Sequence, residues 1–286
     1  MKITIDPDSG FCFGVKQAIA LAEAELDAGQ EVYCLGEMVH NQMEMDRLKS
    51  KGLRIISHDD LPQMKGRKVL VRAHGEPPST FLIAEQLGIS IINATCPIVG
   101  RLQEQIRKSF SSNDVDQRQI VVFGKPGHAE VVGLNGNADN KAIVVHSVDD
   151  LDEIDFSKPV HLFSQTTMDA AHYGEMAEAI EQRMGSNCAE LIVQKSACRQ
   201  VSGRASDLKL FAAAYDMILF VAGKNSANGA YLFSVCKDAN PKSYFVTGPD
   251  DLKKEWLHQV ESIGITGATS TPLWQLQAFS EMLQSL

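Results

Sequence analysis

A repeated pattern constrains the fold of this chain more than any other feature of its sequence. Short β-branched runs are each followed by a turn of small and polar residues and then by a helical stretch. The clearest runs are Val69–Val71, Ile120–Phe123, His161–Phe163, Ile218–Val221 and Ile263–Ile265. The helical stretches are predicted over residues 14–28, 98–110, 170–184, 199–214, 229–238 and 272–285. Alternating strands and helices predict the α/β class, with parallel sheets whose ligands bind beyond the carboxyl ends of the strands.

The length of 286 residues suits two or three domains rather than one small core. No low-complexity linker divides the chain, and the pattern places boundaries near 96 and near 194–198. We therefore expect three α/β domains, over residues 1–96, 97–193 and 194–286. The first of these carries an N-terminal segment that contains Cys12.

Composition excludes several classes of protein. The net charge of −9 and the pI near 5.4 argue against general nucleic-acid binding, which needs a basic face. No run of 18 apolar residues is present, so no membrane span is expected. The start, MKITIDPDSG, lacks the apolar core of a signal peptide, and we expect a cytoplasmic protein. No glycine-rich dinucleotide or P-loop motif occurs, which argues against an integral NAD(P) or nucleoside triphosphate site.

Three of the six cysteines differ from the others in their surroundings. Cys12, Cys96 and Cys198 each stand at the start of a predicted helix. Free backbone N–H groups and the helix dipole stabilise a thiolate there, which suits a metal ligand. The remaining cysteines, Cys34, Cys188 and Cys236, are interpreted as small buried hydrophobic residues.

The spacing of the three candidate ligands is wide, at 84 and 102 positions, so each predicted domain would contribute one sulfur. No local C-x-x-C occurs, which argues against a zinc ribbon or a bacterial ferredoxin-type run. Cysteine context alone leaves inert cysteines as an open alternative. Three thiolates on one metal centre would leave a position free for substrate chemistry.

Polar loops after the apolar runs predict an anion site. His40, His74 and His128 each follow such a run. Ser226, Asn228 and Ser270 lie close to predicted helix starts, where free N–H groups bind phosphate. The alternative is that Asn228 and Ser270 merely cap their helices.

Glu130 follows His128 by two residues, so in an extended loop both side chains would face one side. A carboxyl group in a desolvated pocket can have a raised pKa and serve as a proton donor. Thr166 and Thr167 add hydroxyl groups after another strand. The set therefore combines an electron source, a grip for a diphosphate and a proton donor.

These motifs together resemble one enzyme family. The segments GFCFGV, EMVHN, AHGEPP, ATCP, GHAEVVG, SQTT, CRQ, GKNSANG and GATSTP occur in this order. They resemble the 4-hydroxy-3-methylbut-2-enyl diphosphate reductases, LytB-type iron–sulfur enzymes of the non-mevalonate isoprenoid pathway. The likeness extends from Gly10 to about Pro272.

The resemblance implies three α/β domains in a pseudo-threefold arrangement around a central [4Fe–4S] cluster. Cys12, Cys96 and Cys198 would hold three irons and leave the fourth for the substrate hydroxyl. The diphosphate would be bound by His40, His74, Ser226, Asn228 and Ser270.

By the same resemblance, His128 would hydrogen-bond near the substrate, Glu130 would supply protons, and Thr166 would orient the hydroxyl and proton network. Two electrons, from a donor such as ferredoxin or flavodoxin, and two protons would then give isopentenyl or dimethylallyl diphosphate and water.

Two positions depart from the family pattern. Ala227 stands where many members have a second serine, which removes one possible phosphate donor. The segment after the third cysteine reads CRQVSGR where many members have a threonine-rich stretch.

Two other classes remain as rival interpretations of the residues. One is an iron–sulfur or zinc protein with a regulatory or binding role and no turnover. The other is a zinc hydrolase of phosphate esters.

Overall fold

The computed structural model describes residues 1–111, 118–185, 190–198 and 203–286. In these ranges, no helix has the length and apolar character needed to cross a membrane. The chain divides into two compact units, and each is described by itself. The first consists of Met1–Glu31, Glu37–Ile55 and Arg199–Leu286, and the second of Val32–Gly36 and Ile56–Cys198.

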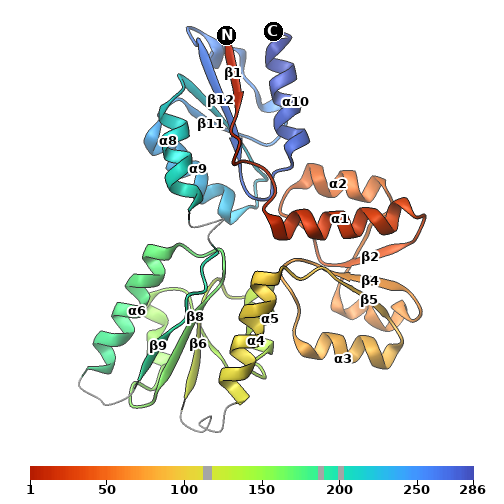
Figure 1. Cartoon of the computed structure of the whole chain (residues 1–286), viewed down its shortest axis with the longest axis vertical. Helices are drawn as coiled ribbons and strands as arrows, with labels where there is room; N and C mark the ends of the chain where they lie inside the picture. The colour runs from red at the N-terminus through yellow and green to blue at the C-terminus, as the bar shows by residue number, and fades with distance from the viewer. Residues whose placement is uncertain (112–117, 186–189, 199–202) are drawn as a thin grey trace. The chain divides into compact units, whose positions relative to one another are not determined.

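The described strands form three four-stranded sheets, which confirms the predicted α/β class (Figure 1). The sheet of the first unit has the order β1-β12-β10-β11, with all of its pairs parallel. Its strands are β1 (Lys2–Ile5), β10 (Met217–Val221), β11 (Ser243–Val246) and β12 (Ser262–Gly267). The pairing of β1 with β12 joins the two ends of the sequence in one sheet.

The helices of the first unit are α1 (Phe13–Asp27), α2 (Gln42–Ser50), α8 (Arg204–Ala213), α9 (Ala227–Ala239) and α10 (Leu273–Gln284). Strand β10 is buried along its whole length and serves two cores. Leu219 and Val221 pack with Phe279 of α10, whereas Ile218 and Phe220 pack with residues of α8 and α9. Burial of both faces explains why this strand is a continuous apolar run.

The remaining two sheets have the orders β3-β2-β4-β5 and β7-β6-β8-β9. The strands of the former are β2 (Val32–Leu35), β3 (Arg54–Ile56), β4 (Lys68–Val71) and β5 (Ser90–Asn93). Those of the latter are β6 (Gln119–Phe123), β7 (Ile143–Val145), β8 (Val160–Ser164) and β9 (Leu191–Val193). The second unit's helices are α3 (Pro78–Leu87), α4 (Pro97–Ser111), α5 (Ala129–Gly136) and α6 (Ala170–Met184).

Strand β6 shows how the second unit is built from alternating side chains. Ile120 and Val122 pack against α4 and α5, while Val121 and Phe123 pack against α6. The sheet is therefore covered by helices on both faces, as parallel sheets require. Short 3₁₀ helices occur at His58–Met64, Val148–Glu153, Pro249–Asp251 and Lys254–Leu257. The predicted division into three domains at 96 and 193 stays a prediction.

A buried ion pair holds the start of the first unit in place. Asp6, which follows β1, pairs with Arg204 at the start of α8, and both side chains are almost fully buried. The Thr266 hydroxyl donates to Asp6 Oδ2 at 2.7 Å and accepts from Arg204 Nη2 at 2.8 Å. Because the two charges satisfy each other away from water, neither can be removed without leaving the other uncompensated.

We expect Asp6→Ala to lower the free energy of unfolding of this unit by about 3–5 kcal/mol, the usual cost of an unpaired buried charge. Urea denaturation measures the change. The matched control is Asp27→Ala, which breaks an exposed pair with Lys51 in the same unit and should leave the midpoint unchanged. An Asp6→Ala midpoint equal to that of the wild type would contradict a structural role for the pair.

Candidate functional site

Every candidate site residue lies in a segment that follows the carboxyl end of a strand. Cys12, His40, His74 and Cys96 come after β1, β2, β4 and β5, respectively. His128 with Glu130, Thr166 and Cys198 follow β6, β8 and β9; Ser226 with Asn228 follow β10, and Ser270 follows β12. The carboxyl ends of parallel strands are the usual ligand-binding edge of a sheet.

In the second unit, the buried carboxyl group of Glu130 is held by Thr166. Glu130 Oε1 accepts a hydrogen bond from the Thr166 backbone N–H at 2.6 Å, and Oε2 accepts from the Thr166 hydroxyl at 3.0 Å. Both residues are buried, with exposed fractions of 2% for Glu130 and 5% for Thr166. The carboxyl group is thus fixed in position by the loop after β8.

Burial raises the pKa of Glu130 to about 7, although the two hydrogen bonds from Thr166 act to lower it. Desolvation dominates because a buried carboxylate loses its hydration. A carboxyl group that titrates near neutral pH can both hold and release a proton under physiological conditions.

Thr166 also connects Glu130 to one of the candidate metal ligands. Its carbonyl oxygen accepts a hydrogen bond from the Cys198 N–H at 2.9 Å. Thr166 therefore binds the Glu130 carboxyl group through its N–H and hydroxyl, and the Cys198 backbone through its carbonyl. Ser196 supports the same segment, because its hydroxyl accepts from the Ser164 N–H at 3.1 Å.

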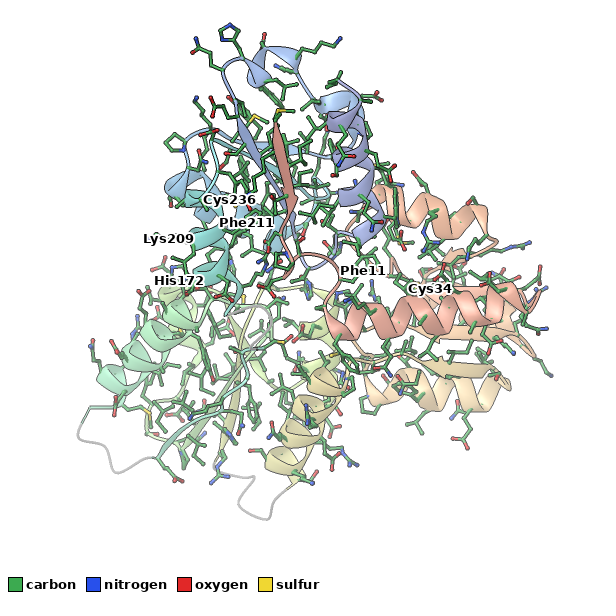
Figure 2. All side chains as sticks on the ribbon, turned by 45° about the horizontal axis from the view of Figure 1, so that its top comes forward. Phe11, Cys34, His172, Lys209, Phe211 and Cys236 are labelled. Atoms are coloured by element: carbon green, nitrogen blue, oxygen red, sulfur yellow. The ribbon has the colours of Figure 1, made fainter. Side chains whose placement is uncertain are left out.

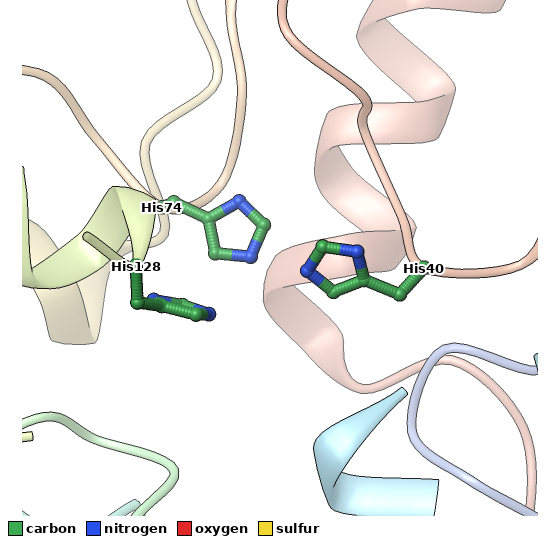
Figure 3. A group of neighbouring side chains, drawn as sticks. All are labelled: His40, His74 and His128. Carbon is green, nitrogen blue, oxygen red and sulfur yellow. The ribbon is translucent and has the colours of Figure 1, made fainter. Parts of the chain in front are cut away.

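His74 and His128 lie next to each other in the second unit. Their ring centroids are 5.3 Å apart, and the rings meet edge to face at 83° (Figure 3). The backbone N–H of Cys96 donates to the carbonyl of Ala73, the residue before His74, at 3.0 Å. This unit thus contains two neighbouring imidazoles, two half-buried thiols and a neutral-range carboxyl group.

In the first unit, Cys12 is the N-cap residue of α1, as the sequence predicted for a helix start. Its N–H donates to the carbonyl of Thr269 at 3.2 Å, and the side chain is half-buried. Cys12 lines a cavity of about 320 Å³ together with Thr269 and Arg204, among others. The thiol is therefore accessible beside a helix N-terminus, where an anionic sulfur is favoured.

Three polar side chains of the first unit gather after β10 and β12. Ser226 caps α9 by accepting from the Gly229 N–H at 3.0 Å, and its hydroxyl lies 3.4 Å from that of Ser270. Asn228 Oδ1 accepts from the Thr269 hydroxyl at 3.2 Å. The buried Asn228 Nδ2 has no hydrogen-bond partner among the described residues. An unsatisfied amide donor at a helix N-terminus is suited to an anionic ligand.

The segment that carries His40 is fixed to the loop after β10 by a close backbone approach. A Cβ atom on Gly223 would lie 2.2 Å from the His40 carbonyl oxygen, so only glycine fits at this position. The neighbouring Asn41 donates from Nδ2 to Gln275 Oε1 of α10 at 2.9 Å and caps α2.

Two of the cysteines interpreted as structural are buried within their elements. Cys34 lies on β2 and Cys236 on α9 (Figure 2). Burial raises the pKa of both thiols to about 12. Such thiols are poor metal ligands because the ligand is the thiolate. Cys188 lies outside the described residues.

Local structure differs from three expectations. Glu130 and His128 do not lie in an extended loop: α5 begins at Ala129, with His128 as its N-cap, and His128 Nδ1 accepts from the Glu130 N–H at 3.2 Å. Asn228 lies inside the first turn of α9, because Ser226 rather than Asn228 is the capping residue.

The expected helix at 272 begins at Leu273 instead, with Pro272 as its N-cap residue. Thr271 turns inward and donates to the Val221 carbonyl at 2.7 Å. The helix expected from 199 is described only from Arg204, since residues 199–202 lie outside the described part of the chain.

Sequence reasoning missed Gln165, which shapes the loop between Ser164 and Thr166. Its buried side chain accepts from the Lys125 N–H at 3.1 Å and donates to the Thr167 hydroxyl at 2.7 Å. It joins the loop after β8 to the loop after β6. In the SQTT motif, only the hydroxyl residues were interpreted as functional. The glutamine among them was the residue that could have indicated a contact between the two loops.

Comparison with known proteins gives the chain a family. The LytB protein family model matches residues 3–284. A 4-hydroxy-3-methylbut-2-enyl diphosphate reductase of Bacteroides fragilis is 46% identical over 285 residues, covering 100% of this chain and 98% of the relative. One of Chloroherpeton thalassium is 39% identical, covering 100% and 97%.

Two solved structures agree with these relatives. The structure of (E)-4-hydroxy-3-methyl-but-2-enyl diphosphate reductase, described as the terminal enzyme of the non-mevalonate pathway, is 30% identical with a TM-score of 0.78 and covers 100% of this chain and 99% of its own. The E-1-hydroxy-2-methyl-but-2-enyl-4-diphosphate reductase from Plasmodium falciparum is 25% identical with a TM-score of 0.84, covering 99% of this chain and 88% of its own. The chain therefore belongs to the LytB protein family.

Proposed function

We propose that this chain reduces 4-hydroxy-3-methylbut-2-enyl diphosphate to isopentenyl diphosphate and dimethylallyl diphosphate. The observation that carries the proposal is the Glu130–Thr166–Cys198 chain of hydrogen bonds in the second unit. Through Thr166, it connects a carboxyl group that titrates near neutral pH to a half-buried cysteine. A reductive dehydroxylation needs this combination, since electrons and protons must both reach the allylic alcohol.

Cys12, Cys96 and Cys198 would hold a [4Fe–4S] cluster. They fit that role because all three are half-buried, and two of them immediately precede helices. The other described cysteines, Cys34 and Cys236, are buried with thiols that stay protonated. The cluster, when bound, supplies the electrons and a Lewis-acidic iron. The reductant would be a small electron carrier such as ferredoxin or flavodoxin.

The diphosphate would be bound by His40, His74, Ser226, Asn228 and Ser270, the residues that the family resemblance assigns to it. Asn228 Nδ2, with no hydrogen-bond partner among the described residues, is a ready donor to a phosphate oxygen. The free N–H groups and dipole of the α9 N-terminus add to the grip. Neutral donors and imidazoles suit a closed site, since they balance anionic charge without many fixed cations.

The reaction consumes two electrons and two protons. The bond between the allylic carbon and its hydroxyl oxygen breaks, one proton leaves with that oxygen as water, and the other forms the new C–H bond. Glu130 would supply protons, and Thr166 would orient the Glu130 carboxyl group and the substrate hydroxyl. His128 would hydrogen-bond near the substrate.

Anaerobic purification with iron and sulfide analysis, followed by turnover with the hydroxylated diphosphate and a chemical reductant, tests the proposal. We expect iron and acid-labile sulfide in similar amounts, and substrate-dependent oxidation of the reductant. Cys34→Ser is the matched control and should keep both iron and turnover, while Cys96→Ser should lose them. Zinc without sulfide would favour a zinc hydrolase, and a cluster without turnover would favour a regulatory protein; either result defeats the proposal.

Glu130→Gln should leave the cluster spectrum unchanged and lower turnover by about two to four orders of magnitude, the usual contribution of a general acid. Because the donor must be protonated, wild-type turnover should be full below pH about 7 and fall about tenfold per unit above it. Rapid-mixing kinetics across this range measure both effects. Glu175→Gln, an exposed position of α6, is the control. Turnover of Glu130→Gln at the wild-type rate would show that Glu130 is not the donor.

Gly223→Ala should weaken binding of inorganic diphosphate by about tenfold or more, because the new methyl group displaces the His40 backbone. Isothermal titration calorimetry measures the affinity. Gly174→Ala, on α6 where the added methyl group would point into open space, is the control and should bind normally. Unchanged affinity in Gly223→Ala would show that the position of His40 does not matter for diphosphate binding.

A further inference from the structure

The side chain of Gln103 lies between two glycines of the second unit. A Cβ atom on Gly75 would be 2.5 Å from Gln103 Nε2, and one on Gly133 would be 2.8 Å from the same atom. The amide therefore fills the space that both glycines leave open. Gln103 Nε2 also points to the carbonyl oxygen of Glu76, at a long 3.5 Å.

The three segments that meet at this amide each carry a candidate site residue. Gly75, with φ of +72°, closes the tight turn that displays His74, and its N–H donates to the Arg72 carbonyl at 3.0 Å. Gly133 lies on α5, which has His128 as its N-cap residue and Glu130 in its first turn. Gln103 lies on α4, which begins directly after Cys96.

A second glycine extends the contact between α5 and the His74 segment. A Cβ atom on Gly136 would be 2.4 Å from Pro77 Cβ. Gly133 and Gly136 are three positions apart and thus share one face of the helix. The α5 backbone approaches residues 75–77 closely along that face, and the Gln103 side chain contacts both Gly75 and Gly133.

We propose that Gln103 is a positioning residue that sets His74 against the start of α5. Its amide spaces the His74 turn from Gly133, and so fixes the edge-to-face contact of the His74 and His128 rings. The residue does not act on the substrate itself. Its effect on catalysis rests on the proposed function, in which His74 binds the diphosphate.

The physical reason is that glycine has no side chain to limit how its segment packs. Removing the amide leaves a gap bounded by two glycine backbones, and the turn at Gly75 can then relax toward α5. Glu130 should be little affected, since Thr166 holds its carboxyl group through two hydrogen bonds that do not involve Gln103. The expected defect is therefore in diphosphate binding rather than in proton transfer.

Gln103→Ala, prepared as the cluster-containing enzyme, tests the proposal against Gln105→Ala, an exposed glutamine of the same helix. We expect the KM for the allylic diphosphate to rise about fivefold in Gln103→Ala, with kcat within twofold and the pH profile of kcat unchanged. Gln105→Ala should match the wild type. A merely structural defect would lower kcat through loss of active enzyme at constant KM, and that result overturns the proposal.

A second measurement does not depend on turnover. NMR of the imidazole protons should show ring-current shifts of His74 and His128 in Gln103→Ala and none in Gln105→Ala. Unchanged shifts in Gln103→Ala overturn the proposal, whatever the activity. Failure of the wild type to convert the substrate would instead count against the proposed function alone.

A double-mutant cycle gives the sharpest test. Gly133→Ala should displace the Gln103 amide and raise KM in the wild-type background. In the Gln103→Ala background the clash is gone, so the same substitution should have little further effect. Strictly additive effects would show that Gly133 and Gln103 act independently and would overturn the spacing role.

Discussion

Parallel strands end together at one edge of their sheet, and this constraint determines where the chemistry of this chain lies. Each described sheet has helices packed on it, so side chains within strands such as β10 are committed to two cores. The loops after the strands remain for polar residues. Cysteines, histidines and hydroxyl residues follow nine of the strands, whereas the strand interiors are almost entirely apolar. Residues that stabilise the fold therefore lie in the strands, and residues with reactive or polar side chains lie in the loops that follow them.

Among the polar residues of these loops, Glu130 has the surroundings that most clearly alter its chemistry. Burial pushes its pKa upward, and two hydrogen bonds from Thr166 oppose the shift, so that the group titrates near neutral pH. The same threonine holds the backbone of Cys198. Movement of the loop after β8 would therefore affect the carboxyl group and the cysteine together.

Sequence patterns predicted the long and strongly apolar elements and failed for short ones. The sequence predicted strands β4, β6, β8, β10 and β12. A strand that is buried on both faces has a continuous run of β-branched and other apolar residues, which is easy to recognise. Helix α5 was missed because AEVVGLNG combines two valines and two glycines, all weak helix formers. Its glycines serve packing against residues 75–77, and that contact is not visible in local sequence. The pairing of β1 with β12, and the ion pair of Asp6 with Arg204, likewise join residues far apart in the chain.

The candidate residues themselves could be named from their motifs, yet their local geometry could not. The expected extended loop at His128 is a helix start, and the cap expected near Asn228 belongs to Ser226. In each case, which of several nearby polar residues caps the helix depends on which backbone N–H groups the fold leaves unpaired. Gln165 and Gln103 could not be predicted for a related reason, since no sequence spacing marks an amide that contacts segments distant in the chain.

The burial of Cys34 and Cys236 has a consequence for how the protein withstands oxygen. Burial raises the pKa of both thiols to about 12, so they stay protonated at neutral pH, whereas oxidants attack the thiolate. Among the described cysteines, oxidants should therefore react first with the half-buried Cys12, Cys96 and Cys198. The two interior thiols would also be slow to exchange with disulfides, because that reaction too proceeds through the thiolate.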